Sequence, residues 1–138
     1  MTAGGDLIAR VDGVLRDGPA LRLAVVFGSV ARGEHHAGSD VDVGIVPVDP
    51  ALPLRAELEL QRRLEGACGR PVHLVRLDRA STLLKWKVAN DGRPVVSDPP
   101  HMWSRFVAAS AIEFAELAPQ LRDAEERFRA RLASGPAR

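Results

Sequence analysis

The sequence predicts a single α/β (α+β) domain in which helices flank a small mixed β-sheet. Three short segments rich in β-branched and apolar residues, 21–27, 40–46 and 71–77, have the composition of strands. The segments around them repeat apolar residues at three- and four-residue spacing, as amphipathic helices do. A chain of 138 residues is long enough to bury one hydrophobic core. Helices alternating with short strands favour this fold class.

Composition narrows the classes of function. Lys and Arg number 19 against 18 Asp and Glu, a net charge of +1, so no overall field attracts nucleic acid or an anionic membrane. Cys68 is the only cysteine, which excludes an internal disulfide and favours a reducing compartment. Residues 1–10 lack a signal-peptide pattern, and no apolar run approaches the roughly 20 residues of a membrane span. We therefore expect a cytoplasmic protein with no membrane partner.

The first third of the chain predicts a helix and two strands. The helix carries its apolar residues on one side, at Leu7, Ile8, Val11, Val14 and Leu15. Residues 21–27, LRLAVVF, predict a buried strand that ends in a tight turn at Gly28. Residues 40–46, DVDVGIV, alternate acidic or small residues with apolar ones. A strand there presents both carboxylates, Asp40 and Asp42, on one face.

The middle of the chain predicts two further helices around a third strand. Pro53 suits a helical first turn, and the apolar spacing continues to Gly69. Residues 71–77, PVHLVRL, read as the strand. Asp78 or Ser81 then caps a helix that stops before Gly92.

The last third is predicted to be a short edge strand followed by helices. Residues 94–97, PVVS, form the strand, and Pro119 is expected to interrupt the helical pattern that follows. A charged helix over 120–132 closes the chain. We divide the chain into a core domain, 1–98, and a C-terminal helical extension, 99–138, packed on the core or on a partner.

Four aromatic residues have interpretations that do not involve chemistry. Trp86 and Trp103 occupy apolar helical positions, which favours packing in a core or interface over base stacking. His35 and His36 lie in the loop before the acidic strand, and a solvated loop is favoured over a metal site because the partners for a full ligand shell are missing.

Gly28, Ser29 and the two aspartates form a pattern typical of nucleotide chemistry. Carboxylates at i and i+2 on a strand offer hard oxygen ligands to one point, as Mg²⁺ requires beside phosphates. Gly28 lets the backbone approach a phosphate, and Ser29 offers a hydroxyl and N–H groups at the start of a helical turn. Arg32 follows, and its guanidinium is expected to meet phosphate or to fold back onto an acid.

The joint spacing carries a family resemblance. Gly-Ser, ten residues, then Asp-x-Asp, with strands on both sides, resembles the nucleotidyltransferases of the DNA polymerase β superfamily, and within it the minimal nucleotidyltransferase (MNT) family. The likeness is specific over residues 21–46. It continues more weakly through RPVHLVRLDRASTLL and NDGRPVV, so that it covers about residues 5–97. The resemblance implies the polymerase β-like nucleotidyltransferase fold.

The resemblance also implies a reaction and a partner. In such proteins the Gly-Ser turn, here Gly28 and Ser29, holds the triphosphate of ATP, and the paired aspartates, here Asp40 and Asp42, bind Mg²⁺. Many bacterial members are antitoxins encoded beside a HEPN-domain ribonuclease, and some neutralise it by transferring AMP to a tyrosine. The expected function is therefore AMP transfer to a hydroxyl of a HEPN toxin. The chain contains no tyrosine, so a tyrosine acceptor lies on another molecule.

One position departs from the family pattern. The third catalytic carboxylate of the family lies on the next core strand, where this chain has His73. Imidazole accepts protons but coordinates Mg²⁺ less readily than oxygen does. His73 is therefore the provisional proton acceptor in a slower enzyme, in one that uses Mn²⁺, or in an inactive protein.

Three alternative functions follow from these residues. The main one is a catalytically impaired protein that neutralises its partner by binding alone. Modification of a small molecule such as an aminoglycoside is disfavoured because only a short helical segment is left to build a substrate pocket. A tRNA-directed enzyme is disfavoured further because no basic or aromatic platform is visible.

Overall fold

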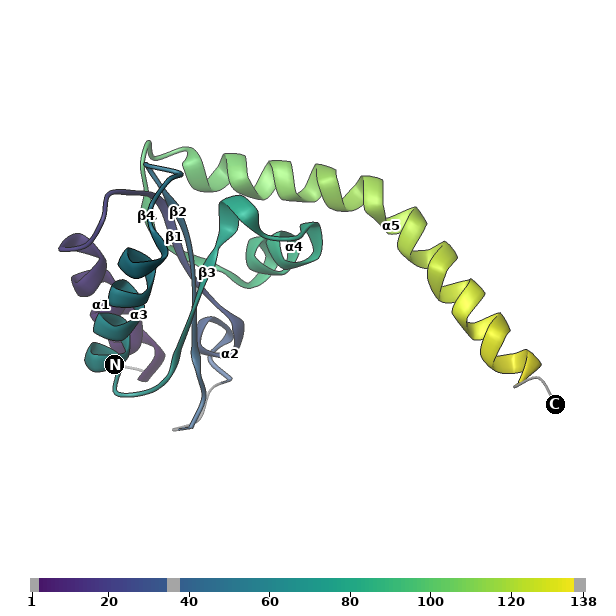
Figure 1. Ribbon diagram of the computed structural model, residues 1–138, viewed down its shortest axis with the longest axis horizontal. Coiled ribbons are helices and arrows are strands. Elements are labelled where there is room, and N and C mark those ends of the chain that lie inside the picture. Colours follow the sequence, from purple (N-terminus) through teal and green to yellow (C-terminus); the bar gives the residue numbers. More distant parts are fainter. Residues whose placement is uncertain (1–2, 35–37, 136–138) are drawn as a thin grey trace.

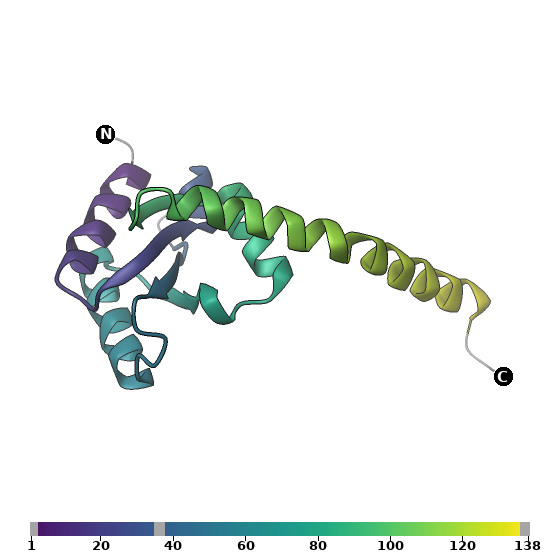
Figure 2. The ribbon, with the colours of Figure 1, turned by 90° about the horizontal axis from the view of Figure 1, so that it is seen from above.

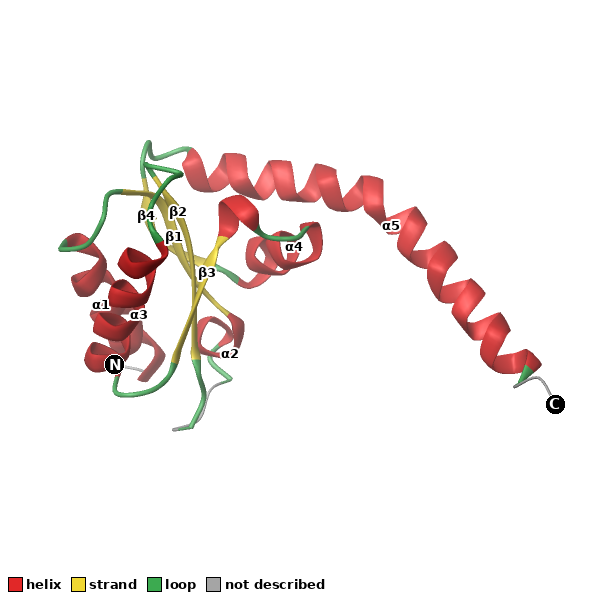
Figure 3. Ribbon diagram, in the orientation of Figure 1, coloured by secondary structure: helices red, strands yellow, loops and turns green. Residues whose placement is uncertain are grey.

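The computed structural model describes residues 3–34 and 38–135. Helices flank a four-stranded sheet, as Figures 1 and 3 show, which confirms the predicted fold class. In chain order the elements are α1 (Ala3–Arg16), β1 (Leu21–Phe27), α2 (Gly28–Arg32), β2 (Val41–Pro47), α3 (Leu54–Cys68), β3 (Val72–Arg76), the 3₁₀ turn η1 (Leu77–Arg79), α4 (Thr82–Asp91), β4 (Arg93–Ser97) and α5 (Met102–Ser134).

The sheet is small and mixed, with strand order β3-β2-β1-β4. β1 runs antiparallel to β2 and to β4, whereas β2 and β3 are parallel and are joined through α3. β4 lies at the edge, as its proline predicted. Phe27 pairs with Asp42 across β1 and β2, and Asp42 pairs with His73 across β2 and β3. This register aligns the end of β1 with the beginnings of β2 and β3.

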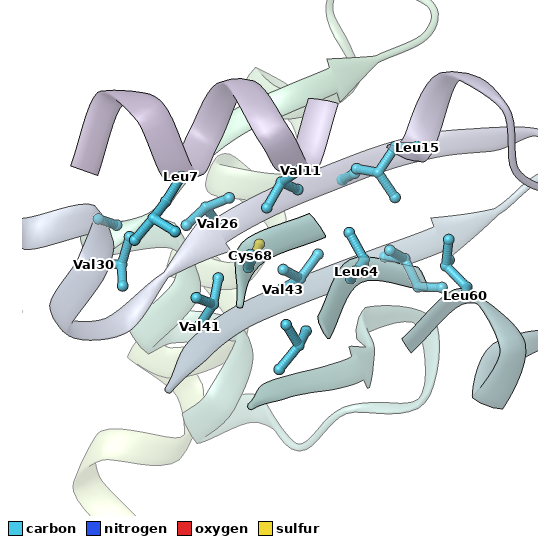
Figure 4. Close-up of a cluster of buried hydrophobic side chains, with 14 of the residues drawn as sticks. Leu7, Val11, Leu15, Val26, Val30, Val41, Val43, Leu60, Leu64 and Cys68 are labelled. Atoms are coloured by element: carbon cyan, nitrogen blue, oxygen red, sulfur yellow. The ribbon is translucent and has the colours of Figure 1, made fainter. Parts of the chain in front are cut away.

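Both faces of the sheet are covered by helices, which is why β1 is apolar from Leu23 to Phe27. Ala24 and Val26 of β1 face the larger cluster, beside α1 and α3 (Figure 4). Leu23, Val25 and Phe27 face a second cluster, to which α4 and α5 contribute. A strand buried on both sides reads as a continuous apolar run.

The face of β2 that carries Asp42 is shaped by a glycine. A Cβ atom on Gly44 would lie 2.8 Å from three side-chain carbons of Leu77, so only glycine fits beneath η1. Leu77 is buried there in the second cluster. The apolar cover therefore reaches Gly44, while the Asp42 side chain, 26% exposed, stays open to solvent.

The prediction of a helix break at Pro119 was wrong. α5 is one helix from Met102 to Ser134 with Pro119 inside it. Proline has no N–H to donate to Ala115, and its ring crowds that turn, so it bends a helix without always ending it. Figure 1 shows α5 changing direction along its length. The division of the chain into residues 1–98 and 99–138 stays a prediction.

The isolated aromatic and sulfur side chains serve packing. Trp86 of α4 stacks on Phe114 of α5 with ring centroids 4.7 Å apart, and Trp103 stacks on Phe106. Cys68 is buried at the end of α3, and burial raises the pKa of its thiol. Within the two described ranges, no helix combines the length and apolarity of a membrane span.

The end of β3 holds a buried cation. The Arg76 side chain is 7% exposed, and its guanidinium donates to both carboxylate oxygens of Asp78 at 2.8 and 2.6 Å and to the carbonyl oxygen of Pro50 at 3.1 Å. Glu57 approaches it at 3.7 Å. The hydrogen bond from Arg76 is the main cause that lowers the pKa of Asp78 below its ordinary value. This cluster fixes the segment that carries Leu77.

We predict that Asp78→Asn lowers the free energy of unfolding by about 2–3 kcal/mol near neutral pH, because Arg76 then stays buried with only the more distant Glu57 to balance its charge. Since folding lowers the pKa of Asp78, its stabilisation is complete above the ordinary Asp pKa and disappears as the pH falls through the lowered value. The two proteins should therefore converge in acid. Urea unfolding measured as a function of pH checks this.

The matched control is Asp123→Asn, which removes the carboxylate of an exposed i,i+4 pair with Arg127 on α5. Its expected cost is no more than about 0.5 kcal/mol. Equal losses in the two variants would show that the Arg76 cluster is no stronger than a surface pair.

Candidate active site

The turn after β1 depends on Gly28. Its φ of +74° lies in the left-handed region, and its residue is buried. A Cβ atom there would collide with Oδ2 of Asp42 and would lie 3.2 Å from Cγ. Only glycine therefore combines this turn with so close an approach to the carboxylate. α2 begins at once, and no side chain caps its first turn.

The two aspartates lie at the start of β2. Asp42 is inside the strand, and Asp40 is an exposed residue just before it. Asp42 faces the α4 side of the sheet, because its neighbour Val41 is buried in the opposite cluster. The prediction that Asp40 already belongs to the strand was early by one residue. The Gly28-Ser29 turn and the Asp42 carboxylate thus meet at one rim of the sheet, and Asp40 lies two residues before Asp42 in the chain.

His73 lies beside Asp42 on the neighbouring parallel strand. Its Nδ1 is 3.5 Å from Oδ1 of Asp42, and its side chain is 72% exposed. Asp78 belongs to η1 beyond the far end of β3 and is bound to Arg76. The described part of the chain contains no group of three or more His, Cys, Asp or Glu side chains arranged to hold a metal ion. His35 and His36 lie outside the described residues.

Arg32 folds back onto acids, one of its two predicted arrangements. Its Nε donates to Glu34 at 3.0 Å and its Nη1 to Asp91 at 2.9 Å. The hydrogen bond with Glu34, followed by that with Asp91, raises the pKa of the guanidinium. Asp91 ends α4, so the ion pair joins α2 to α4. The sequence marked Asp91 only as part of a helix stop, because a partner 59 residues away leaves no local signal.

The arrangement suits a phosphorylated ligand bound with a divalent cation. The first turn of a helix presents N–H donors to an anion, and the Asp42 carboxylate lies next to Gly28, the first residue of α2. Mg²⁺ binds in proteins through one or two carboxylates together with substrate phosphates and water. The Asp42 carboxylate beside the turn, with Asp40 two residues before it, therefore fits a cation that is shared with a nucleotide.

Comparisons with known proteins agree with this geometry. A model of the family described as Polymerase beta, Nucleotidyltransferase matches residues 10–101. The protein adenylyltransferase MntA of Shewanella oneidensis is 38% identical over 81 residues. That alignment spans 58% of this chain and 58% of the relative.

Solved structures extend the likeness into α5. A chain in the crystal structure of a toxin–antitoxin with AMP-PNP is 27% identical, with a TM-score of 0.78 over 88% of this chain and 98% of that one. A chain of the tri-AMPylated Shewanella oneidensis HEPN toxin in complex with MNT antitoxin is 25% identical, with a TM-score of 0.65 over 88% of this chain and 98% of that one.

We predict that Gly28→Ala abolishes nucleotide binding and destabilises the fold. The new Cβ collides with the Asp42 carboxylate, and alanine in the left-handed conformation adds strain of about 1–2 kcal/mol. Gly33→Ala is the matched control. Gly33 has the same φ of +74°, but a Cβ there meets nothing within 4 Å. It should lose only the strain energy and keep binding. Calorimetric titration with ATP and thermal unfolding measure both effects, and equal binding by the two variants would contradict the assignment.

Proposed function

Because this chain belongs to the nucleotidyltransferase family of polymerase beta, we propose that it transfers AMP from ATP to a hydroxyl group of a HEPN-domain toxin and thereby neutralises that toxin. The observation that carries the proposal is the contact of the Gly28 turn with Asp42 at the rim where β1, β2 and β3 meet. The similarity to MntA and to an antitoxin solved with an AMPylated HEPN toxin supports it. We place the reaction in the cytoplasm, in keeping with a single unpaired cysteine.

The acceptor is proposed to be a tyrosine of the partner protein. The chain has no tyrosine of its own. The relative solved with AMPylated toxin supports a protein acceptor over a small molecule. The helical extension supports the same choice, since from Pro119 onward it is exposed and encloses no substrate.

Gly28 and Ser29 are proposed to hold the β- and γ-phosphates. N–H groups of Ser29 and Val30 point out of the first turn of α2, and the Ser29 hydroxyl adds a donor. Arg32 has two expected roles, and its ion pairs with Glu34 and Asp91 favour positioning of α2 over direct contact with phosphate.

Asp40 and Asp42 are proposed to hold Mg²⁺, or Mn²⁺ in its place, together with the phosphates. The fit rests on the Asp42 carboxylate beside the Gly28 turn and on the i, i+2 spacing of Asp40 and Asp42. When bound, the cation neutralises charge on the phosphates of the reacting nucleotide. Asp42 in addition faces His73, so it orients the imidazole.

His73 is proposed to accept the proton of the attacking hydroxyl. The acceptor oxygen forms a bond to the α-phosphorus of ATP, the bond to the bridging oxygen of the β-phosphate breaks, and pyrophosphate leaves. Nδ1 of His73 faces Oδ1 of Asp42, which leaves Nε2 as the nitrogen that takes the proton. Its exposed ring is open to a macromolecular acceptor.

A second function is favoured by one observation. The position beside Asp42 on β3 carries His73 where the family has a carboxylate, so the protein is also a candidate for neutralisation by binding alone. The two functions differ in one requirement. AMP transfer needs the carboxylate of Asp42, whereas a binding module needs only the shape of the partner-facing surface.

The first test mixes the purified protein, the product of the neighbouring gene and α-labelled ATP with Mg²⁺ or Mn²⁺. We expect label on the partner and a loss of at least about a hundredfold in rate with Asp42→Asn. Asp49→Asn is a control, because Asp49 lies in the loop after β2, where it accepts a hydrogen bond from Ala51. Transfer that survives Asp42→Asn would refute the proposed site. Neutralisation that survives without any transfer would favour the binding module.

A second test replaces His73, the residue that differs from the family pattern. We expect His73→Asp to raise the rate with Mg²⁺, because a third oxygen ligand then lies next to Asp42, and His73→Ala to lower it by about 10²-fold through loss of the proton acceptor. Single-turnover kinetics with both metals measures these rates. Unchanged rates in both variants would remove His73 from the mechanism.

A further inference from the structure

The short helix α2 is held from both sides of the sheet. Val30 and Ala31 are buried in the larger cluster, beside α1 and α3. Arg32 reaches α4, which covers the opposite face, and its Nη1 donates to Oδ2 of Asp91 at 2.9 Å. A helix of five residues is too short to be stable alone. The position of the Gly28-Ser29 turn is therefore set by packing on one side and by this ion pair on the other.

The end of α4 that carries Asp91 is closely packed. The next residue, Gly92, has no room for a side chain. A Cβ atom there would lie 2.5 Å from Cγ1 of Val25 and 3.1 Å from Cη2 of Trp103. It would also collide with the carbonyl oxygen of Val88, to which the N–H of Gly92 donates at 2.7 Å. The end of α4 is therefore fixed against β1 and α5.

The rest of α4 is attached to α5. Trp86 stacks on Phe114 with an angle of 7° between the ring planes, and Lys85 pairs with Glu113 at 2.7 Å. Figures 1 and 2, seen at right angles, both show α4 beside the first half of α5. The contact of Asp91 with Arg32 therefore links α2 to the layer that α4 and α5 form together.

The stability of α4 itself does not explain an acidic residue at position 91. Asp91 is the last residue of α4, where the partial negative charge at the end of a helix disfavours a carboxylate. Its side chain is 25% exposed, and the ion pair joins it to a residue 59 positions away. The carboxylate therefore stabilises the arrangement of α2 rather than the helix that carries it.

We propose that Asp91 is a positioning residue that, through Arg32, holds the Gly28-Ser29 turn in the conformation that receives the β- and γ-phosphates of ATP. The inference rests on the proposed function, because that function assigns these phosphates to the turn. The layer of α4 and α5 thereby contributes to nucleotide affinity without carrying any of the residues assigned to the phosphates or the cation.

NMR relaxation of the backbone amides of residues 29–33 in the ligand-free chain tests the positioning. We expect Asp91→Ala to lower the order parameters of these amides, because one of the two anchors of α2 is then lost. Asp12→Ala is the matched control, since it removes the carboxylate of an exposed ion pair with Arg16 at 3.0 Å within α1. It should leave residues 29–33 unchanged. Order parameters that stay unchanged in Asp91→Ala as well would overturn the inference.

Calorimetric titration with ATP and with AMP, each with Mg²⁺, tests the consequence for binding. Asp91→Ala should raise the Kd for ATP about fivefold, because the turn must then be ordered on binding. The Kd for AMP, which lacks the β- and γ-phosphates, should stay the same. Asp12→Ala should bind both nucleotides as the wild type does. Equal losses for ATP and AMP in Asp91→Ala, or no loss for either, would overturn the inference.

A double-mutant cycle with Arg32→Gln provides the second arm of the test. The variant with both changes should bind ATP no more weakly than Arg32→Gln alone, because both changes remove the same contact. Losses that add would overturn the inference. A chain that binds no ATP, but in which Asp91→Ala loosens residues 29–33, would refute the proposed function and would still support the positioning of α2 by Asp91.

Discussion

The contact between Gly28 and the Asp42 carboxylate is the constraint on which the arrangement of the site depends. It requires a residue without a side chain at the end of β1, in a left-handed conformation, directly against the first acidic residue inside β2. Strand register places this pair, because Phe27 pairs with Asp42 and Asp42 pairs with His73. The apolar layers on both faces of β1 fix that register, since a shift by one residue would turn buried side chains outward. The same strand register therefore sets both the packing of the core and the geometry of the site.

Much of the fold and of the candidate site could be predicted from local sequence. The bounds of β1 agree with the segment 21–27, and the spacing of Gly28, Ser29 and the aspartates predicted a candidate site in which the structure brings Gly28 next to Asp42. Such features are local, since glycine turns, strand alternation and helix stops leave their signals within a few residues. The family of the chain followed from the same short stretch.

What could not be predicted depends on pairings between distant segments. The strand order, the neighbourhood of Asp42 and His73, and the tie between Arg32 and Asp91 all arise from tertiary packing. Pro119 shows the opposite failure, because a strong local signal for a helix break was overridden within a long helix. Propensity is a weak guide when a helix is held at one end by a core and carries supporting ion pairs further along.

The central claim is that the ends of three strands form one nucleotide site, and NMR of the histidine side chains during titration with ATP and Mg²⁺ tests it most directly. The account predicts that the imidazole resonances of His73 shift on binding while those of His101, before α5, stay fixed. Asp42→Asn should remove the shift. Saturable binding of ATP that leaves the His73 resonances unchanged would contradict the account, because the nucleotide would then lie elsewhere on the molecule.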